Sequence, residues 1–347
     1  MIKKRNLTAI RRQLSKGLLV VAVVIGTAFG LTNVMPAEAK ELKLSFFMSP
    51  KHPMNKAVFK RFANDLKQVS GGKLTVKLFP GGTLNAAPPQ QYSRLLEGVA
   101  DISFGLPGYT GQLFPVTNTI TVPGLAKNSI DGTKRLIRAR ELIEAEYDAK
   151  VLAVWANETK VLITKSKPVH RLEDVNGMTI RVTSAQDVPY IEALGASAVA
   201  QPVNVIHQNL TNGTIDAIHI GSSAIGSFKL WEPANYITVN MPPSVSAFFL
   251  LMNKDVWHGL SMKEKGWVDQ ASGPNLWLAG GKGYDAAGKR GLKIAAGKGV
   301  KLITLPDTEV KRFQDAMTPA IETYKNTSLR PGLTGGQVIE AMGGLDN

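Results

Sequence analysis

The fold is decided by the middle of the chain, residues 178–220, which read MTIRVTSAQDVPYIEALGASAVAQPVNVIHQNLTNGTIDAIHI. Short apolar runs alternate there with segments that repeat apolar residues at helical spacing. We expect strands over 178–182, 198–201 and 214–220 and helices over 187–194 and 203–210. Strands and helices in this order form a mainly parallel sheet covered on both faces. The stretch therefore predicts a doubly wound α/β domain.

The same alternation continues on both sides of this stretch. Further strands are expected over 42–47, 74–78, 99–104, 151–155, 161–163, 236–239, 247–252 and 300–305. A glycine-rich helical stretch then runs from a capping box at Ser261 to Ala296. Each interior glycine costs about 1 kcal/mol relative to alanine, so we expect a kink near Gly273-Pro274 or close helix packing. The chain of 347 residues is long enough for one large core or two moderate ones.

The N-terminus has the three parts of a secretory signal peptide. Basic residues within 3–16 precede an apolar run over 17–31, which is shorter than the roughly 20 residues of a membrane-spanning helix. Ala37-Glu-Ala39 follows as a cleavage site, so we expect removal of residues 1–39. An uncleaved anchor is the alternative. Arg11-Arg12 matches a twin-arginine export signal imperfectly, which leaves the export route open.

Charge and cysteine content exclude several classes of protein. The net charge is +14, but residues 1–39 carry six basic side chains and one acidic one, which leaves +9 on residues 40–347. Basic residues there are spread among acidic ones, which argues against nucleic-acid binding. The chain has no cysteine, so thiol chemistry, Cys-ligated metals and a cysteine-linked lipid anchor are excluded. We expect a soluble protein in the periplasm.

Sequence motifs of catalysis are missing. The chain has no nucleophile elbow, no HExxH helix and no phosphate-binding P-loop. Its five histidines are scattered without metal-ligand spacing, and His207 and His219 are more readily two separate histidines than a pair. We therefore expect no cofactor and no catalytic residue.

One charged residue lies in a segment that is expected to be buried. Arg181 lies near the end of an expected central strand, directly before the next helix. Burial of an unpaired arginine is costly, so its side chain must face a cleft or pair with another group. Its planar fork suits a bidentate carboxylate. The residues alone leave a structural salt bridge and a ligand contact both open.

Short motifs over almost the whole of residues 40–347 resemble one family. In order and spacing they are similar to the DctP-type solute-binding subunits of tripartite ATP-independent periplasmic (TRAP) transporters. The motifs are Pro50-Lys-His52-Pro53, FPGGTL at 79–84, EGVADI at 97–102, LEDVNGMTIRV at 172–182, GAS at 195–197 and LTNGTID at 210–216. Each motif is weak, and their common order is what makes the resemblance specific.

The resemblance implies a two-lobed α/β fold with a cleft between the lobes and a long helix across both. It places lobe I at 40–157 plus 247–287 and lobe II at 158–246 plus 288–347. It also implies a function, in which an organic acid binds, the lobes close around it and the closed form docks on a membrane permease. Such a receptor is not an enzyme. A receptor that feeds a sensor kinase or another permease is the alternative, and a periplasmic enzyme is the weakest one.

The resemblance also assigns candidate ligand contacts. Arg181 stands where the family's carboxylate-clamping arginine is found, and Asn157-Glu-Thr-Lys160 stands where some members carry a second arginine, so Lys160 would act as a point charge. His219 and Ile220 replace polar residues that relatives use. The cleft should therefore suit a monocarboxylate with an apolar or aromatic body. Aromatic residues that could form a stacking wall, or equally belong to the core, are Phe104, Tyr109, Trp155, Trp231 and Phe248.

Overall fold

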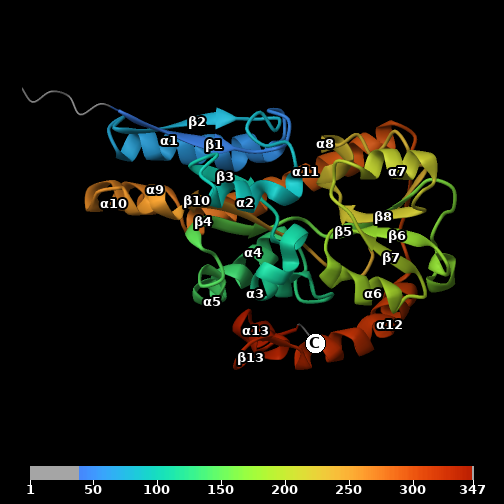
Figure 1. Cartoon of the computed structure of the whole chain (residues 1–347). Helices are drawn as coiled ribbons and strands as arrows, with labels where there is room; N and C mark the ends of the chain where they lie inside the picture. The colour runs from blue at the N-terminus through green and yellow to red at the C-terminus, as the bar shows by residue number, and fades with distance from the viewer. Residues whose placement is uncertain (1–38, 346–347) are drawn as a thin grey trace, which may run out of the picture. The chain divides into compact units, whose positions relative to one another are not determined.

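Two β-sheets, one in each lobe, organise the part of the chain that the structure describes (Figure 1). The structure is a computed structural model that describes residues 39–345. The expected signal peptide therefore lies outside the described residues, apart from Ala39. Among residues 39–345, no helix combines the length and the apolar character that crossing a membrane requires.

The sheet of lobe I has the strand order β2-β1-β3-β10-β4. Its strands are β1 (Lys40–Ser45), β2 (Leu74–Phe79), β3 (Ile102–Gly105), β4 (Ala149–Ala156) and β10 (Ala247–Asn253). β1 pairs in parallel with β2 and β3, whereas β10 pairs antiparallel with β3 and β4. Every residue of β10 is buried, as its apolar sequence predicts for a strand covered on both faces.

The sheet of lobe II has the order β11-β9-β5-β8-β6-β7. Its strands are β5 (Lys160–Thr164), β6 (Thr179–Val182), β7 (Ser197–Ala200), β8 (Ala217–Gly221), β9 (Tyr236–Thr238) and β11 (Lys301–Ile303). β6 pairs in parallel with β7 and β8, which confirms the expected β-α-β-α-β unit. β5 is antiparallel to both of its neighbours.

The antiparallel strands mark where the chain passes between the lobes. Residues 157–159 lead from β4 in lobe I to β5 in lobe II, and residues 239–246 lead from β9 back to β10. A strand that enters from the other lobe does not follow a helix of its own lobe, so it is not bound to run in parallel. The sheets are therefore mixed, where the sequence predicted mainly parallel ones.

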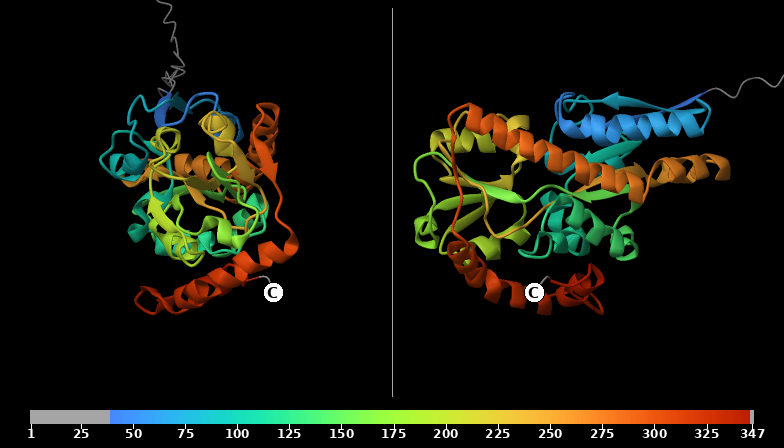
Figure 2. Two further views of the ribbon diagram at one scale, coloured as in Figure 1. Left: turned by 90° about the vertical axis from the view of Figure 1, so that its right-hand side faces the viewer. Right: turned by 180° about the vertical axis from the view of Figure 1, so that it is seen from behind.

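The helix α11 (Pro274–Gly297) is a third connection between the lobes. It packs on α4 (Ser129–Arg138) and β4 in lobe I and on α8 (Ser223–Ser227) in lobe II (Figure 2). A Cβ at Gly280 would collide with the indole ring of Trp155, and one at Gly291 would collide with the carbonyl oxygen of Ser222. The helix starts after a break at Gly273, where φ is 80°. Both the expected break and the expected close packing are present.

The helix α12 (Asp307–Asn326) carries the chain from lobe II to lobe I (Figure 1). Arg312 forms an ion pair with Glu173 in lobe II, and the Tyr324 hydroxyl lies 2.7 Å from Oγ1 of Thr119 in lobe I. The elements that follow are β12 (Ser328–Arg330), β13 (Leu333–Thr334) and α13 (Gly335–Ala341), and α13 packs on lobe I. The structure differs here from the expected division, which places 288–347 in lobe II, because α12 is long enough to reach the other lobe.

The remaining elements cover the sheets or connect their strands. The α-helices are α1 (Lys60–Val69), α2 (Gln91–Leu96), α3 (Pro115–Asn118), α5 (Arg140–Glu144), α6 (Val188–Glu192), α7 (Ile206–Asn212), α9 (Lys254–His258) and α10 (Met262–Ala271). Short helical turns include η1 (Asn55–Phe59), η3 (Pro107–Leu113), η4 (Thr119–Thr121) and η6 (Ala185–Asp187).

Candidate ligand-binding site

A small cavity of about 50 Å³ lies between the two lobes. Lobe I contributes residues that follow its strands, lobe II contributes residues of its central strands and of α8, and α11 contributes Tyr284. The lining residues used below are Phe47, His52, Leu106, Tyr109, Asn157, Arg181, Thr183, Val203, Ile220, Ser223, Phe228, Ser246, Phe248 and Tyr284. Because Asn157 and Ser246 belong to the two crossing segments, the cavity adjoins the connections about which the lobes could move.

Arg181 is the only cation that lines this cavity among the described residues. Its side chain is fully buried. Nε and one terminal nitrogen donate to the carbonyl oxygen of Gln201, at 2.9 and 2.5 Å, and the other terminal nitrogen donates to Oγ1 of Thr183 at 3.3 Å. Burial lowers the pKa of Arg181 from its ordinary value. The oxygens that hold the guanidinium are thus uncharged.

No ion pair to Arg181 is found among residues 39–345, which argues against the structural salt bridge that the sequence left open. Asp187, whose negative charge favours protonation of Arg181, is itself paired with Lys160. A fully buried cation held only by neutral oxygens lacks the compensation that buried charges normally have. An anion in the cavity would supply that compensation.

The lobes are in contact around the cavity. The hydroxyl oxygen of Tyr109 in lobe I accepts a hydrogen bond from the backbone N–H of Val203 in lobe II, at 3.1 Å. The ring of His52 in lobe I lies 6.4 Å from the ring of Phe228 in lobe II, between centroids. The structure therefore shows the lobes closed over the cavity.

The walls of the cavity are largely apolar and uncharged. Phe47, Leu106, Val203, Phe228 and Phe248 are apolar lining residues, together with Ile220. His52 is also uncharged near neutral pH, because burial lowers its pKa to about 4. The site therefore offers one positive group and an apolar surround, which suits a single carboxylate on an apolar body.

The structure brings only some of the sequence-predicted residues to this cavity. Arg181, Asn157 and Ile220 line it, and so do Tyr109 and Phe248 of the proposed aromatic wall. Oδ1 of Asn157 accepts from the backbone N–H of Ser246, which ties the two crossing segments together. The role of the five predicted residues that line the cavity as ligand contacts stays a prediction.

Two predicted residues, Lys160 and His219, lie behind the cavity. Lys160 donates to Oδ1 of Asp187 at 2.7 Å, and both side chains are almost fully buried. His219 points to the same face of the β5–β8 pair as Lys160 because it stands opposite Leu162. Both ring nitrogens of His219 lack a hydrogen-bond partner, and burial beside Lys160 lowers its pKa to about 3. The structure thus places these residues next to Arg181 but not on the cavity wall.

The other predicted aromatic residues also lie outside the cavity. Phe104 and Trp155 are fully buried in lobe I, where both rings pack against Phe248. Trp231 is a partly exposed residue of lobe II whose ring lies under Nζ of Lys298, at 4.8 Å from the centroid. Phe104 and Trp155 would therefore act on a ligand only through Phe248.

Several cavity residues were missed by sequence reasoning. His52 was noticed as part of a motif but not as a site residue, and Tyr284 belongs to the glycine-rich helix that drew attention only for its glycines. Phe47, Val203 and Phe228 look like ordinary core residues in the sequence. A polar or aromatic residue on the buried face of a helix that spans two lobes is the one signal that could have indicated Tyr284.

Glu158 is a further buried group that lies just behind the cavity. Its Oε1 accepts from the backbone N–H of Ser223, a cavity residue, at 2.5 Å, and its Oε2 has no partner. Burial raises its pKa to about 7. Within residues 39–345, no group of three or more His, Asp or Glu side chains is arranged to hold a metal ion.

Two α/β lobes, the crossing segments between them and a buried cation in the seam define a two-lobed solute-binding protein. The family model of bacterial extracellular solute-binding proteins, family 7 (DctP), matches residues 44–327. The chain belongs to this family and is a binding protein of the TRAP type, which acts outside the cytoplasm.

Relatives of known name share low but extended identity with the chain. It is 26% identical to the outer membrane transporter protein TsaT of Comamonas testosteroni, over 95% of this chain and 96% of that protein. It is 27% identical to the 2,3-diketo-L-gulonate-binding periplasmic protein YiaO of Escherichia coli, over 74% of this chain and 79% of that protein.

A solved structure of similar fold is a marine metagenome TRAP solute-binding protein specific for aromatic acid ligands, in complex with 3-hydroxybenzoate. Its TM-score is 0.81 and its identity 25%, with 88% of this chain and 97% of that chain covered.

Proposed function

We propose that this protein captures a monocarboxylate with an apolar body and delivers it to the permease of a TRAP transporter. The carboxylate binds the guanidinium of Arg181, and the apolar part lies against Phe47, Phe228 and Phe248. The lobes close over the ligand, and the closed form docks on the permease. The protein reaches the periplasm through a cleavable leader over residues 1–39 and releases its ligand unchanged.

The observation that carries this proposal is the lack of a carboxylate partner for Arg181 among the described residues. The cavity walls favour a ligand with a single negative charge, because no second cation among the described residues lines the cavity and His52 is neutral. The aromatic acid bound by the marine metagenome protein also carries a single carboxylate, on an aromatic ring.

The volume of the closed cavity favours a compact ligand. A water molecule needs about 10–15 Å³ of such space, so about 50 Å³ has room for roughly four water-sized groups. A short branched acid requires less separation of the walls at Phe228 and Phe248 than an aromatic acid does. The two kinds of acid are therefore compared directly in the test.

The test is a thermal-shift titration of the purified protein with isovalerate, benzoate, 3-hydroxybenzoate and succinate. We expect Tm to rise with the logarithm of concentration for at least one monocarboxylate. Arg181→Met should abolish the rise and Arg181→Lys should weaken it, because lysine lacks the bidentate fork. Mass spectrometry should recover the ligand unaltered.

A matched control comes from a second buried arginine. Arg135 is 3% exposed and lies in lobe I, away from the cavity, so Arg135→Lys should affect Tm without affecting the ligand-induced shift. Circular dichroism of each variant separates lost binding from lost folding. The proposal fails if folded Arg181→Met keeps the shift, or if succinate is preferred over every monocarboxylate.

A further inference from the structure

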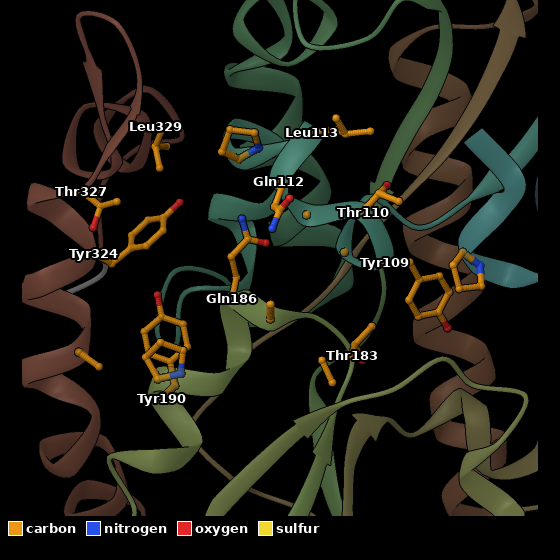
Figure 3. A pocket seen from close by; sticks show the side chains of 18 of the residues that line it. Tyr109, Thr110, Gln112, Leu113, Thr183, Gln186, Tyr190, Tyr324, Thr327 and Leu329 are labelled. Atoms are coloured by element: carbon orange, nitrogen blue, oxygen red, sulfur yellow. The ribbon is translucent and has the colours of Figure 1, made fainter. Parts of the chain in front are cut away.

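A second and much larger cavity lies on the other side of the clamp, under helix α12. Its volume is about 1130 Å³. Lobe I lines it with η3, lobe II lines it with η6, the start of α6 and the end of β7, and α12 closes it (Figure 3). We call it the α12 groove. A volume of this size is that of a small-molecule site.

The described residues that line the α12 groove carry no charge. Tyrosine rings, four prolines and Leu113 and Leu329 give it apolar surfaces. Hydroxyl and amide groups of Thr110, Gln112, Gln186, Tyr190 and Tyr324 give it hydrogen-bonding groups. A carboxylate would find no cation there, so the groove selects for uncharged molecules that combine a ring with hydroxyl or amide groups.

One tyrosine hydroxyl in the groove lacks a hydrogen-bond partner. Tyr190 is only 4% exposed, and its hydroxyl makes no hydrogen bond to any described residue although it points into the groove, near the Tyr324 hydroxyl (Figure 3). The Oε1 atom of Gln186 is buried without a hydrogen-bond partner as well. Polar groups of largely buried residues are normally satisfied, so the open Tyr190 hydroxyl points to a molecule that binds in the groove.

The α12 groove shares a wall with the carboxylate cavity. Tyr109 and Thr183 line both, and the carbonyl oxygen that holds Arg181 belongs to Gln201, which lines the groove. A molecule in the groove therefore touches the supports of the clamp and both lobes at once. Contacts with both lobes in the closed arrangement favour closure.

From these observations we infer that the α12 groove is a second binding site, for an uncharged ring compound with hydroxyl or amide groups, and that its occupation strengthens carboxylate binding at Arg181. The coupling to carboxylate binding rests on the proposed function, whereas the second binding site does not. By linkage the two ligands must strengthen each other by the same factor.

Fluorine NMR of protein labelled with 3-fluorotyrosine tests the site itself. The chain has seven tyrosines, of which Tyr190 and Tyr324 line only the groove and Tyr284 lines only the carboxylate cavity. Tyr→Phe variants at 190 and 324 assign their signals. Benzamide, phenol and methyl glucoside, each to 20 mM, are the probes. We expect at least one to shift the signals of Tyr190 and Tyr324 and to leave that of Tyr284 in place.

A pair of threonines on α12 provides matched variants. Thr323 lines the groove and Thr318 does not, while both are exposed and donate their hydroxyl to the carbonyl four residues earlier. Thr323→Trp should fill the groove and abolish the shifts, whereas Thr318→Trp should keep them. Absence of shifts with all three probes, or shifts that survive in Thr323→Trp, overturns the site.

Calorimetry then tests the coupling. With the groove probe saturating, the Kd of the carboxylate found by thermal shift should fall at least three-fold, and Thr323→Trp should remove this effect. An unchanged or raised Kd overturns the coupling. Failure of the carboxylate to bind at all would instead count against the proposed function, because the tyrosine signals report on the groove independently.

Discussion

Tyr109 and Val203 connect the two lobes, because the phenolic oxygen of Tyr109 in lobe I accepts a hydrogen bond from the backbone N–H of Val203 in lobe II at 3.1 Å. Tyr109 and Val203 lie in different lobes, so the two residues meet only when the lobes close. The same hydroxyl lies beside Arg181, whose positive charge favours the ionised phenol while burial raises the pKa of Tyr109. The contact links closure to the ligand clamp.

Replacement of this hydroxyl should weaken ligand binding. In Tyr109→Phe the N–H of Val203 is buried without its partner, which costs about 1–3 kcal/mol in the closed form only. We expect the Kd of the carboxylate to rise roughly 5- to 100-fold, measured by calorimetry. Tyr92→Phe is the control, because the Tyr92 hydroxyl accepts a backbone N–H from Asp148 within lobe I. An unchanged Kd in Tyr109→Phe would show that the bond does not stabilise closure.

The buried ion pair of Lys160 and Asp187 should be costly to break. Lys160→Met leaves the buried Asp187 carboxylate without its cation, so we expect the free energy of unfolding to fall by about 3–5 kcal/mol. Lys311→Met is matched, since Lys311 and Asp315 are also 2.7 Å apart but largely exposed on α12. That variant should lose at most about 1 kcal/mol. Equal losses in urea denaturation would contradict the assignment of a buried pair.

Glu158 should make stability depend on pH. Its pKa of about 7 in the folded protein exceeds its ordinary value of 4.5, so the folded state binds more protons than the unfolded state between these values. This contribution is full below pH 4.5 and is lost as the pH rises through 7. The free energy of unfolding of Glu158→Gln should therefore rise by about 3 kcal/mol, relative to that of wild type, between pH 4.5 and pH 8.

Urea denaturation at both pH values measures this gain. Glu173→Gln is the control, because Glu173 is on the surface and its hydrogen bonds with Arg312 lower its pKa. That variant should show no such gain at high pH. If the free energies of unfolding of Glu158→Gln and wild type differ by the same amount at both pH values, Glu158 does not titrate in this range.

The glycines of α11 should tolerate no side chain where the helix meets lobe II. A Cβ at Gly291 would collide with the backbone carbonyl of Ser222, which cannot rotate away, so Gly291→Ala should cost about 1–3 kcal/mol. Gly266→Ala in the exposed part of α10 meets nothing within 4 Å and should stabilise the protein by about 0.5–1 kcal/mol. Differential scanning calorimetry measures the stability of both variants relative to wild type. A neutral Gly291→Ala would show that α11 is not tightly packed on α8.

Much of the fold could be predicted from local sequence. The strands around Arg181 and the buried strand over 247–252 follow from hydrophobic periodicity, and the break at Gly273-Pro274 follows from the backbone preferences of those residues. The mixed direction of the sheets could not be predicted, because pairing depends on which lobe a strand comes from. The attachment of α13 to lobe I likewise depends on the reach of α12.

The binding site, too, could be predicted only in part from the sequence. Arg181 could be singled out because a charged residue in a central strand is anomalous wherever it occurs. Lys160 carries the same kind of signal, yet the structure places it against Asp187, a residue 27 positions away in η6. Only the fold shows which of two buried cations has an acidic partner.

By itself the sequence determined the α/β class, the absence of cysteine chemistry and the position of Arg181 in a strand, since each depends on residue type and short-range spacing. Tertiary structure alone decided that Arg181 has no acidic partner among residues 39–345, that Tyr109 and Tyr284 join it at one cavity, and that a neutral groove lies under α12. Those relationships join residues from both lobes, and contacts between distant segments exist only once the chain has folded.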